Sequence, residues 1–346
     1  MSFRSWVTVG TLILLGLVVY FGWPEITQAW RLLDSVNGWI LALIIPVQLL
    51  SYYAVGNIIF LYLRNKGDIR DLSHWSMARM ALELNFVNHI LPSGGAAGFS
   101  YLGWVLNRHG VSAGRAAMAQ IVRFALMFLS FIGLLFFSVL FLILDNNVNR
   151  VTILLCVVMA LLVIGATVFV VYVIGSAKRI QKFSTKLSHI IDWLVSVVTF
   201  GKKKHVINHE KVEKFFNELH FDYIEIRNDK NILKKPLIWA IVANIADVLL
   251  LMIAFWSLGF WVSPATLLIA FGVSGLSGII SVTPGGTGVY EAIMIAFLAS
   301  AGVPPDIAIA GTLLARVALL SGTIIFGYIF YQLTIMKYGK SGKSTA

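Results

Sequence analysis

Long apolar segments constrain this chain more than any other feature of its sequence. About 20 apolar residues are needed to cross the ~30 Å hydrocarbon core of a bilayer as a helix. Five segments meet that length: residues 38–63, 115–144, 151–175, 236–259 and 307–333. Of the 346 residues, 58% are hydrophobic and 12% are charged, against about 25% charged in soluble domains. The sequence therefore predicts an all-α integral membrane protein, a polytopic helical bundle that forms one domain over residues 1–346.

A sixth apolar segment, residues 6–23, lies at the start of the sequence. It is longer than the hydrophobic part of a usual signal peptide, and no small-residue cleavage site follows it. We therefore expect a retained signal anchor. The single cysteine, Cys156, lies in an apolar run, so we expect neither a disulfide framework nor a cysteine-based metal site.

Glycine and proline break the apolar pattern in two regions. The first joins residues 77–90 and 99–107 through "LPSGGAAG", and the second joins residues 264–282 and 292–302 through "TPGGTGVYE". Neither half of either region is clearly long enough to cross a bilayer alone, and Gly and Pro interrupt helices. Each region therefore predicts a re-entrant helical hairpin that enters and leaves the membrane on one side.

One long polar connector covers residues 176–235. Its first part carries apolar residues at helical spacing, with basic residues beside that stripe, which is typical of an amphipathic helix on a membrane surface. The apolar positions are Ile180, Phe183, Leu187, Ile191, Leu194 and Val198, and the basic ones are Lys178, Arg179, Lys182 and Lys186. Most cations lie in this connector, in residues 64–75 and in the C-terminal tail. The positive-inside rule then predicts a multi-pass plasma-membrane protein with both termini cytoplasmic.

The two broken regions resemble each other in the order and spacing of their residues. Gly94 aligns with Gly285, Gly110 with Gly302 and Arg123 with Arg316, at separations of 191, 192 and 193 positions. The charge rule opens the first hairpin to the cytoplasm and the second to the outside. The sequence thus predicts an inverted repeat, residues 38–144 and 236–335, which in transporters places the substrate site near the membrane midplane. A chance likeness between two glycine-rich hairpins is the alternative.

The charged residues inside the apolar segments are candidate functional residues: Arg79, Glu83, Arg123, Asp247, Glu291 and Arg316. An unpaired charge at the bilayer centre costs about 3 kcal/mol or more, so these side chains should face one another or a cavity. Arg123 and Arg316 suit an anionic headgroup, because a guanidinium binds phosphate bidentately. Glu291 suits an ion pair with one arginine or a cationic group on a substrate. The alternatives are ion pairs that only hold a hairpin in place and, for Arg79 and Glu83, local i,i+4 pairing.

Breaker residues mark the two hairpin tips: Gly94, Gly95, Pro284, Gly285, Gly286 and Gly288. Such a tip leaves backbone N–H groups free, and a helix that begins there favours an anion such as phosphate. Tight hairpin packing without a ligand is the alternative. His205 and His209 have i,i+4 spacing but no evident third ligand, so we expect no metal. No catalytic triad or Walker loop emerges, and we expect no cofactor and no nucleic-acid partner.

The string "SVTPGGTGVYEAIMIAFLASAGVPPDIAIAGTLLARVALL" resembles the signature of the lysylphosphatidylglycerol synthase transmembrane family, and "LPSGGAAGFSYLGWVL" resembles its first-half counterpart. The resemblance places Pro284, Gly285, Gly286, Gly288, Glu291 and Arg316 on the family pattern, with Gly94, Gly95 and Arg123 in the first half. In that family, the membrane domain of the multiple peptide resistance factor flips aminoacylated phosphatidylglycerol to the outer leaflet. A separate soluble domain transfers lysine or alanine from tRNA. This sequence ends shortly after its last expected span, so we expect that catalytic domain to be absent.

Three functions are compatible with these observations. We favour a lipid flippase, which could assemble as a homo-oligomer and would move an anionic or aminoacylated phospholipid, or a polyprenyl phosphate, between leaflets. The second is a membrane enzyme, or the membrane half of one, that modifies phosphatidylglycerol or a lipid-linked sugar, as some stand-alone family members suggest. The missing catalytic constellation counts against it. The third is a scaffold whose connector recruits a soluble partner.

Overall fold

The structure is a computed structural model that describes residues 20, 23, 27, 36–90, 96–144, 150–198, 209–276 and 288–338. Within these ranges the chain is helical, with short turns and without strands. The expected signal anchor at residues 6–23 lies almost entirely outside them. So do the hairpin tips with Gly94, Gly95, Pro284, Gly285 and Gly286, and the connector residue His205.

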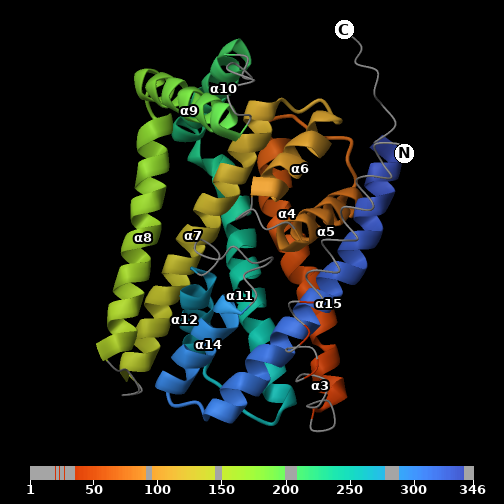
Figure 1. The fold of residues 1–346 in the computed structure, drawn as a ribbon, viewed down its shortest axis with the longest axis vertical. Helices are drawn as coiled ribbons and strands as arrows, with labels where there is room; N and C mark the ends of the chain where they lie inside the picture. The colour runs from red at the N-terminus through yellow and green to blue at the C-terminus, as the bar shows by residue number, and fades with distance from the viewer. Residues whose placement is uncertain are drawn as a thin grey trace.

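Five long helices run the length of the bundle (Figure 1). They are α4 (Ile44–Asn65, preceded by the short α3, Gly38–Ala42), α7 (Ala113–Leu144), α8 (Arg150–Ile174), α11 (Lys234–Ser257) and α15 (Pro305–Tyr338). Each lies in a stretch long and apolar enough to cross a membrane. They match the five expected spans to within a few residues at most ends, which confirms the expectation of a polytopic membrane protein.

Shorter helices form the two broken regions. The first contains α5 (His74–Ile90) and α6 (Ala96–Asn107), and the second contains α12 (Pro264–Gly275) and α14 (Val289–Ser300). A 12-residue helix is only about 18 Å long, well short of the ~30 Å core. The α5–α6 pair lies at one end of the bundle and the α12–α14 pair toward the other (Figure 1). The two pairs thus have the layout expected of opposed re-entrant hairpins.

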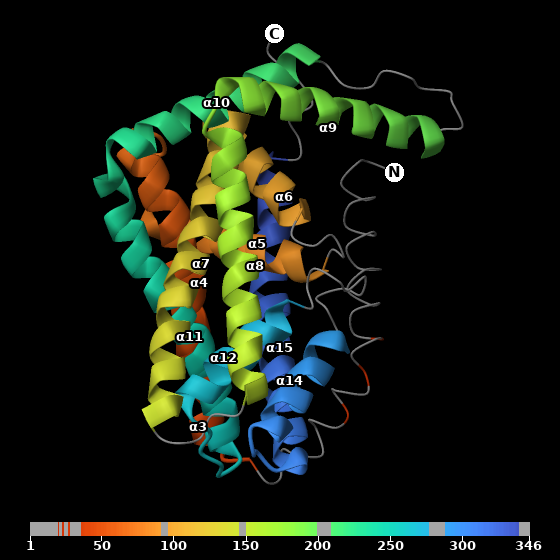
Figure 2. The same ribbon diagram turned by 90° about the vertical axis from the view of Figure 1, so that its left-hand side faces the viewer.

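The polar connector lies across one end of the bundle, which we call the connector face. It contains α9 (Ala177–Val198), α10 (His209–Asn228) and the short 3₁₀ helix η2 (Lys230–Leu233). Figure 2 shows α9 running across the ends of the spans rather than along them, as expected of a surface helix. On α9, Ile180 is buried while Lys178, Lys182 and Lys186 are exposed. The end of α15 lies at the same face, so the connector and the C-terminal end of the last span share one side (Figure 1).

Carboxylates of α10 fasten the connector to the spans. The buried Asp222 carboxylate lies 3.6 Å from Lys66 Nζ beyond α4 and 3.6 Å from Arg115 Nε on α7. Glu218 accepts hydrogen bonds from the Ser112 hydroxyl at 2.7 Å and from the Gly114 N–H at 3.0 Å. Both carboxylates bind residues at the start of α7. These ion pairs and hydrogen bonds therefore hold α10 on α7.

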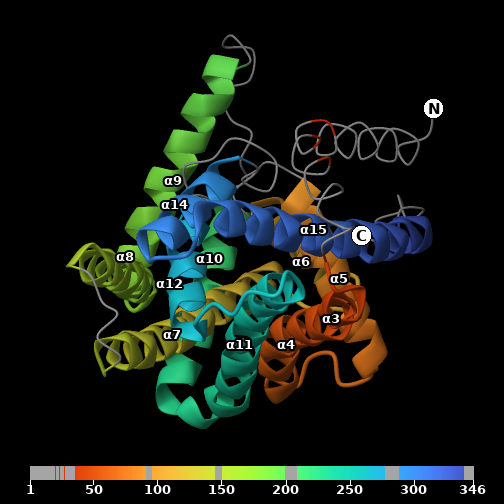
Figure 3. The same cartoon turned by 90° about the horizontal axis from the view of Figure 1, so that it is seen from below.

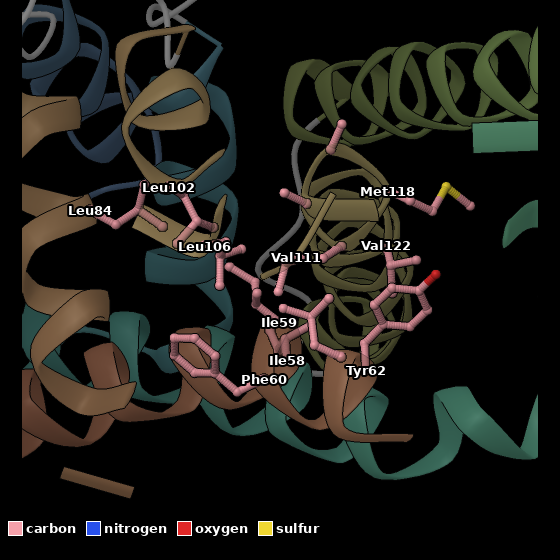
Figure 4. Close-up of a cluster of buried hydrophobic side chains, with 14 of the residues drawn as sticks. Ile58, Ile59, Phe60, Tyr62, Leu84, Leu102, Leu106, Val111, Met118 and Val122 are labelled. Carbon is pink, nitrogen blue, oxygen red and sulfur yellow. The ribbon is translucent and has the colours of Figure 1, made fainter. Parts of the chain in front are cut away.

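A buried hydrophobic cluster fixes the first hairpin near the connector face (Figure 4). Side chains from α4, α5, α6 and α7 interdigitate there: Ile58, Ile59, Phe60, Leu84, Leu102, Leu106, Met118 and Val122. A second cluster packs α11, α12, α14 and α15 together toward the opposite end. Since lipid is as apolar as these side chains, close packing rather than burial from water holds such helices together.

The first helix of each hairpin packs on the last span of the other half of the chain. Thus α5 lies against α15, α12 lies against α7, and the most extensive helix–helix contact joins α4 to α11. Figure 3 shows α4 and α11 side by side, with α7 beside α11. This exchanged packing favours the predicted inverted repeat, which stays a prediction.

Two side-chain amides make equivalent contacts in the two halves. Gln48 on α4 donates to the Leu319 carbonyl at 2.7 Å and to the Thr323 hydroxyl at 3.3 Å, both on α15. Asn244 on α11 donates to the Met127 carbonyl at 3.0 Å and to the Ser130 hydroxyl at 2.8 Å, both on α7. The paired positions are separated by 192 to 196 residues, close to the spacing of the two arginines. Each amide therefore ties one half to the last span of the other.

Equivalent glycines also end equivalent helices. Gly110 after α6 has φ +81° and Gly302 after α14 has φ +90°, values that side chains rarely adopt. In both turns the glycine N–H bonds the carbonyl three residues back, at 3.1 Å, and the next residue's N–H bonds five residues back. The aligned glycines of the sequence thus occupy the same kind of turn.

The crossing of α5 and α15 gives a first prediction. A Cβ on Gly327 would collide with Phe86 Cβ and with the Leu82 carbonyl, neither of which can rotate away. Gly327→Ala should therefore lower the free energy of unfolding by about 1–3 kcal/mol through overpacking. Thermal unfolding in detergent measures the change. Gly133→Ala, at a position with open space, is the matched control, and an equal effect of both substitutions would contradict the close packing.

Candidate functional site

The start of α14 positions Glu291. Gly288, the N-cap residue before Val289, has φ +89°, a left-handed value that glycine adopts readily. The Gly288 N–H donates to Glu291 Oε2 at 2.7 Å, so the carboxylate satisfies one of the free N–H groups of the first turn. Glu291 therefore lies in the first turn after the tip, where its charge also suits the positive end of the helix.

The other Glu291 oxygen binds Arg316. Arg316 Nε on α15 lies 2.7 Å from Glu291 Oε1, and the two side chains are only 11% and 4% exposed. The guanidinium also lies over the Tyr290 ring, 5.0 Å from its centroid. Of the two partners that the sequence left open for Glu291, the structure has the ion pair with Arg316, which joins α14 to α15 inside the bundle.

His89 brings the first hairpin to the same place. It is the second-last residue of α5 and interacts electrostatically with Arg316. His89 Nδ1 lies 2.8 Å from the Asn85 carbonyl, so Nδ1 carries a proton and Nε2 is left as an acceptor. Arg316 therefore interacts with one residue of each broken region, by an ion pair with Glu291 and electrostatically with His89. Sequence reasoning missed His89, although its place just before the "LPSGG" breaker could have indicated it.

Asp247 on α11 lies where α11 packs against α4, a contact that we call the seam. Its carboxylate accepts a hydrogen bond from the Ser51 hydroxyl at 2.7 Å. It also interacts electrostatically with Tyr52 on α4 and Tyr290 on α14. Ser51 and Asp247 are 196 positions apart, like Gln48 and Asn244, so the two seam helices meet at equivalent positions.

Arg79 and Glu83 form the local pair that their i,i+4 spacing predicts, with Arg79 Nε 3.2 Å from Glu83 Oε1. Glu83 has no exposed surface and accepts two further hydrogen bonds, from the Tyr101 and Thr334 hydroxyls, each at 2.7 Å. The carboxylate therefore links α5, α6 and α15. All its contacts are internal, so this pair acts in packing.

Arg123 is placed apart from the other charges. Its Nη2 donates to Gln120 Oε1 at 3.2 Å, and its guanidinium lies 4.1 Å from the centroid of the Phe124 ring. Among the described residues no carboxylate pairs with it, and its Nε has no hydrogen-bond partner. The structure therefore separates the two repeat-related arginines by role: Arg316 is neutralised by the protein, and Arg123 is not.

The backbone at Gly288 gives a second prediction. A non-glycine residue at a positive φ costs about 1–3 kcal/mol, while a Cβ there would meet no atom within 4 Å. Gly288→Ala should therefore destabilise the start of α14 through backbone strain alone, measured as a lower unfolding temperature in detergent. Gly275→Ala, on α12 with open space and no positive φ, should cause no loss. A Gly288→Ala protein as stable as wild type would contradict the positive φ.

Comparison with known proteins places this arrangement in a family. Residues 7–327 match the family described as the lysylphosphatidylglycerol synthase TM region. The chain belongs to this family. A UPF0104 membrane protein of Methanocaldococcus jannaschii is 28% identical over 164 residues, which are 47% of this chain and 46% of that protein. A UPF0104 membrane protein of Methanothermobacter thermautotrophicus is 21% identical over 312 residues, 90% of this chain and 89% of that protein. No solved structure matches.

Two grooves open on the sides of this lysylphosphatidylglycerol synthase-type membrane region. One, of about 540 Å³, lies between α4, α5 and α15 and is lined mainly by apolar side chains, with Tyr52 and His74 among them. The other, of about 380 Å³, lies between α7, α8 and the connector, and Phe124 lines it. Tyr52 links the first groove to the Asp247 seam, and Phe124 links the second to Arg123.

Proposed function

We propose that this protein moves an anionic phospholipid of the phosphatidylglycerol type, or another lipid phosphate, between the two leaflets of the cell membrane. The observation that carries the proposal is the buried Glu291–Arg316 pair, which His89 approaches from the opposite hairpin. A charged pair between the second broken region and the last span thus lies in the interior of a membrane protein, within electrostatic range of a histidine of the first broken region. This supports a polar site for a charged headgroup, as in transporters built from discontinuous helices.

The energetic cost of placing charged side chains inside the membrane supports a functional role for Glu291, Arg316 and Arg123. Each ionised side chain at this depth costs about 3 kcal/mol or more unless it is compensated. Well-packed apolar residues would hold α14 on α15 at least as well as a buried ion pair. Arg123, which has no carboxylate partner among the described residues, supports the same reading more strongly, because its charge fits a ligand that supplies the anion.

The grooves suit the apolar part of such a lipid. In the proposed mechanism, acyl chains lie in the side grooves while the phosphate enters the polar interior. Arg123 donates to the phosphate oxygens, and Phe124 under its guanidinium lines the groove of about 380 Å³. The exposed lysines of α9 gather anionic lipid at the connector face, which the charge rule assigns to the cytoplasm.

Lipid exchange in vesicles tests this proposal. The purified full chain is reconstituted in liposomes that contain a trace of fluorescent phosphatidylglycerol, and an impermeant quencher reports the rate at which lipid changes leaflet. Wild-type protein should exchange phosphatidylglycerol faster than protein-free vesicles, and faster than it exchanges phosphatidylcholine. Glu291→Gln should lose most of this exchange.

Exposed residues of the connector provide matched controls. Glu213→Gln and Arg227→Ala change the same charges on the surface of α10 and should keep wild-type exchange. Exchange equal to that of protein-free vesicles for every anionic lipid would refute the proposal. Transfer of lysine to lipid by this chain alone, with charged tRNA supplied, would replace it with the enzyme alternative.

A further inference from the structure

Asp247 faces the interior of the bundle. On α11 the side chains of Ile241, Ile245 and Leu249 recur at helical spacing and are 37%, 43% and 37% exposed, so they mark the lipid-facing side. Asp247 lies two residues from Ile245 and from Leu249, which turns it to the opposite side of the helix. It is only partly buried there. The carboxylate therefore faces internal space rather than lipid.

Asp247 differs from the other two acidic residues inside the bundle in having no cation beside it. Glu83 pairs with Arg79, and Glu291 pairs with Arg316. Asp247 has the Ser51 hydroxyl, and among the described residues no Lys, Arg or His forms an ion pair with it. One hydroxyl does not compensate an ionised carboxylate at this depth. Asp247 can therefore bind a proton and become neutral.

The groups around Asp247 connect it to the proposed lipid site. Tyr52 on α4 and Tyr290 on α14 are the titratable groups that interact electrostatically with it, and the Arg316 guanidinium on α15 lies 5.0 Å from the centroid of the same Tyr290 ring. In the part of the chain that the structure describes, no charged group of α3, α7 or α12, the other helices packed on α11, interacts with it. Tyr290 is therefore the residue within electrostatic range of both Asp247 and the Glu291–Arg316 pair.

A second group of hydrogen-bonding side chains begins at Tyr52, the residue after Ser51, and borders a groove. The Tyr52 hydroxyl contacts Gln48 Nε2, at 2.6 Å, and the Thr323 hydroxyl. Tyr52 also lines the groove of about 540 Å³ whose lining includes the exposed His74 at the start of α5, near the connector face. A proton thus has polar groups beside Asp247 and an opening nearby.

We propose that Asp247 takes up and releases one proton in each transport cycle, so that lipid movement is coupled to the proton gradient. The inference rests on the lipid transport proposed above. A proton from water forms an O–H bond with the carboxylate as the anionic headgroup enters, and the bond breaks again to water after the headgroup leaves. An anion raises the cost of a second negative charge close to it, so headgroup and proton bind together. By linkage, each then strengthens the binding of the other to the same degree.

Vesicles with an imposed pH difference test the coupling. One pH unit is worth about 1.4 kcal/mol per proton, so one coupled proton can enrich labelled phosphatidylglycerol in one leaflet by up to about tenfold. Wild-type protein should show enrichment that a protonophore abolishes, and a trapped pH dye should report proton movement that depends on added lipid. Asp247→Asn should lose both the enrichment and the dye signal, while Asp247→Glu should keep them.

Infrared spectroscopy provides a readout that does not require transport. Wild-type protein should show the carbonyl band of a protonated carboxylic acid that titrates with pH and strengthens when phosphatidylglycerol is added. Asp247→Asn should lack that band, and Asp229→Asn, outside the spans, should keep it. Folding of each variant is checked by its elution and thermal unfolding in detergent.

The outcomes separate this inference from the proposed function. Exchange without any response to the pH difference, or a response that persists in folded Asp247→Asn, would overturn the coupling and leave lipid transport standing. No exchange by wild type for any anionic lipid would refute the proposed function, and the coupling would fall with it. A titrating band that is unchanged in Asp247→Asn would assign the proton to another group and would also overturn the inference.

Discussion

Arg316→Ala is expected to abolish lipid exchange and to lower the free energy of unfolding by about 3–5 kcal/mol, the cost of breaking a buried ion pair. The substitution leaves the Glu291 carboxylate, 4% exposed, without its cation. Glu291 also accepts the hydrogen bond from the Gly288 N–H, so the start of α14 is disturbed together with the pair. Thermal unfolding in detergent and exchange in liposomes measure the two effects on the same preparation.

A double substitution separates two effects: the effect of an uncompensated charge on stability, and the effect of the ion pair on lipid exchange. Glu291→Gln combined with Arg316→Gln removes both charges and keeps side chains that can hydrogen-bond each other. It should recover much of the stability that Arg316→Ala loses, because no uncompensated charge is left, while exchange stays absent. Arg316→Ala with wild-type stability would contradict the buried pair, and wild-type exchange by the double variant would exclude both residues from the site.

Arg123→Ala is expected to reduce lipid exchange without lowering the stability of the protein, whereas Arg316→Ala lowers both. Its guanidinium has no carboxylate partner among the described residues, so its removal should leave the unfolding temperature unchanged or raise it. Exchange of phosphatidylglycerol should fall by roughly tenfold to a hundredfold, the loss of one charge-assisted hydrogen-bonding group of about 1.5–3 kcal/mol. Loss of function without loss of stability would distinguish a ligand-binding arginine from a structural one.

Conservative replacement refines this result. Arg123→Lys keeps the charge but loses the fork that matches a phosphate bidentately, so it should retain only part of the exchange. Arg227→Ala, on the surface of α10, should change neither measurement. If Arg123→Ala instead destabilises the protein as Arg316→Ala does, Arg123 has a structural partner and the phosphate would have to be assigned elsewhere.

The parts of this fold that depend on local sequence could be predicted from it. The spans follow from uninterrupted apolar runs, and the short helices α5, α6, α12 and α14 follow from the breakers that separate them. The Arg79–Glu83 pair follows from i,i+4 spacing, and Gly110 and Gly302 mark equivalent turns because few other residues adopt their φ values.

The parts that depend on packing between the halves could not be predicted. Nothing local in the sequence reveals that Ser51 meets Asp247 or that His89 approaches Arg316, because these contacts depend on how α4, α5, α11 and α15 cross. The sequence left Glu291 either an arginine or a cationic group on a substrate as its partner, and only the placement of α14 on α15 selects Arg316. The unequal roles of Arg123 and Arg316 have the same origin, since Glu291 pairs with Arg316 while none of the described carboxylates pairs with Arg123.

The packing of α5 on α15 has a consequence for how the protein is made. More than 200 residues separate the end of α5 from the start of α15, so the ribosome needs roughly 10–40 s to supply the partner surface. During that time Glu83 lacks the Thr334 hydroxyl and Phe86 lacks the surface at Gly327. The first half of the new chain is therefore in the membrane before the α15 surface that α5 packs on has been synthesised. Until α15 is inserted, the Glu83 carboxylate has only its contacts within the first half, with Arg79 and Tyr101.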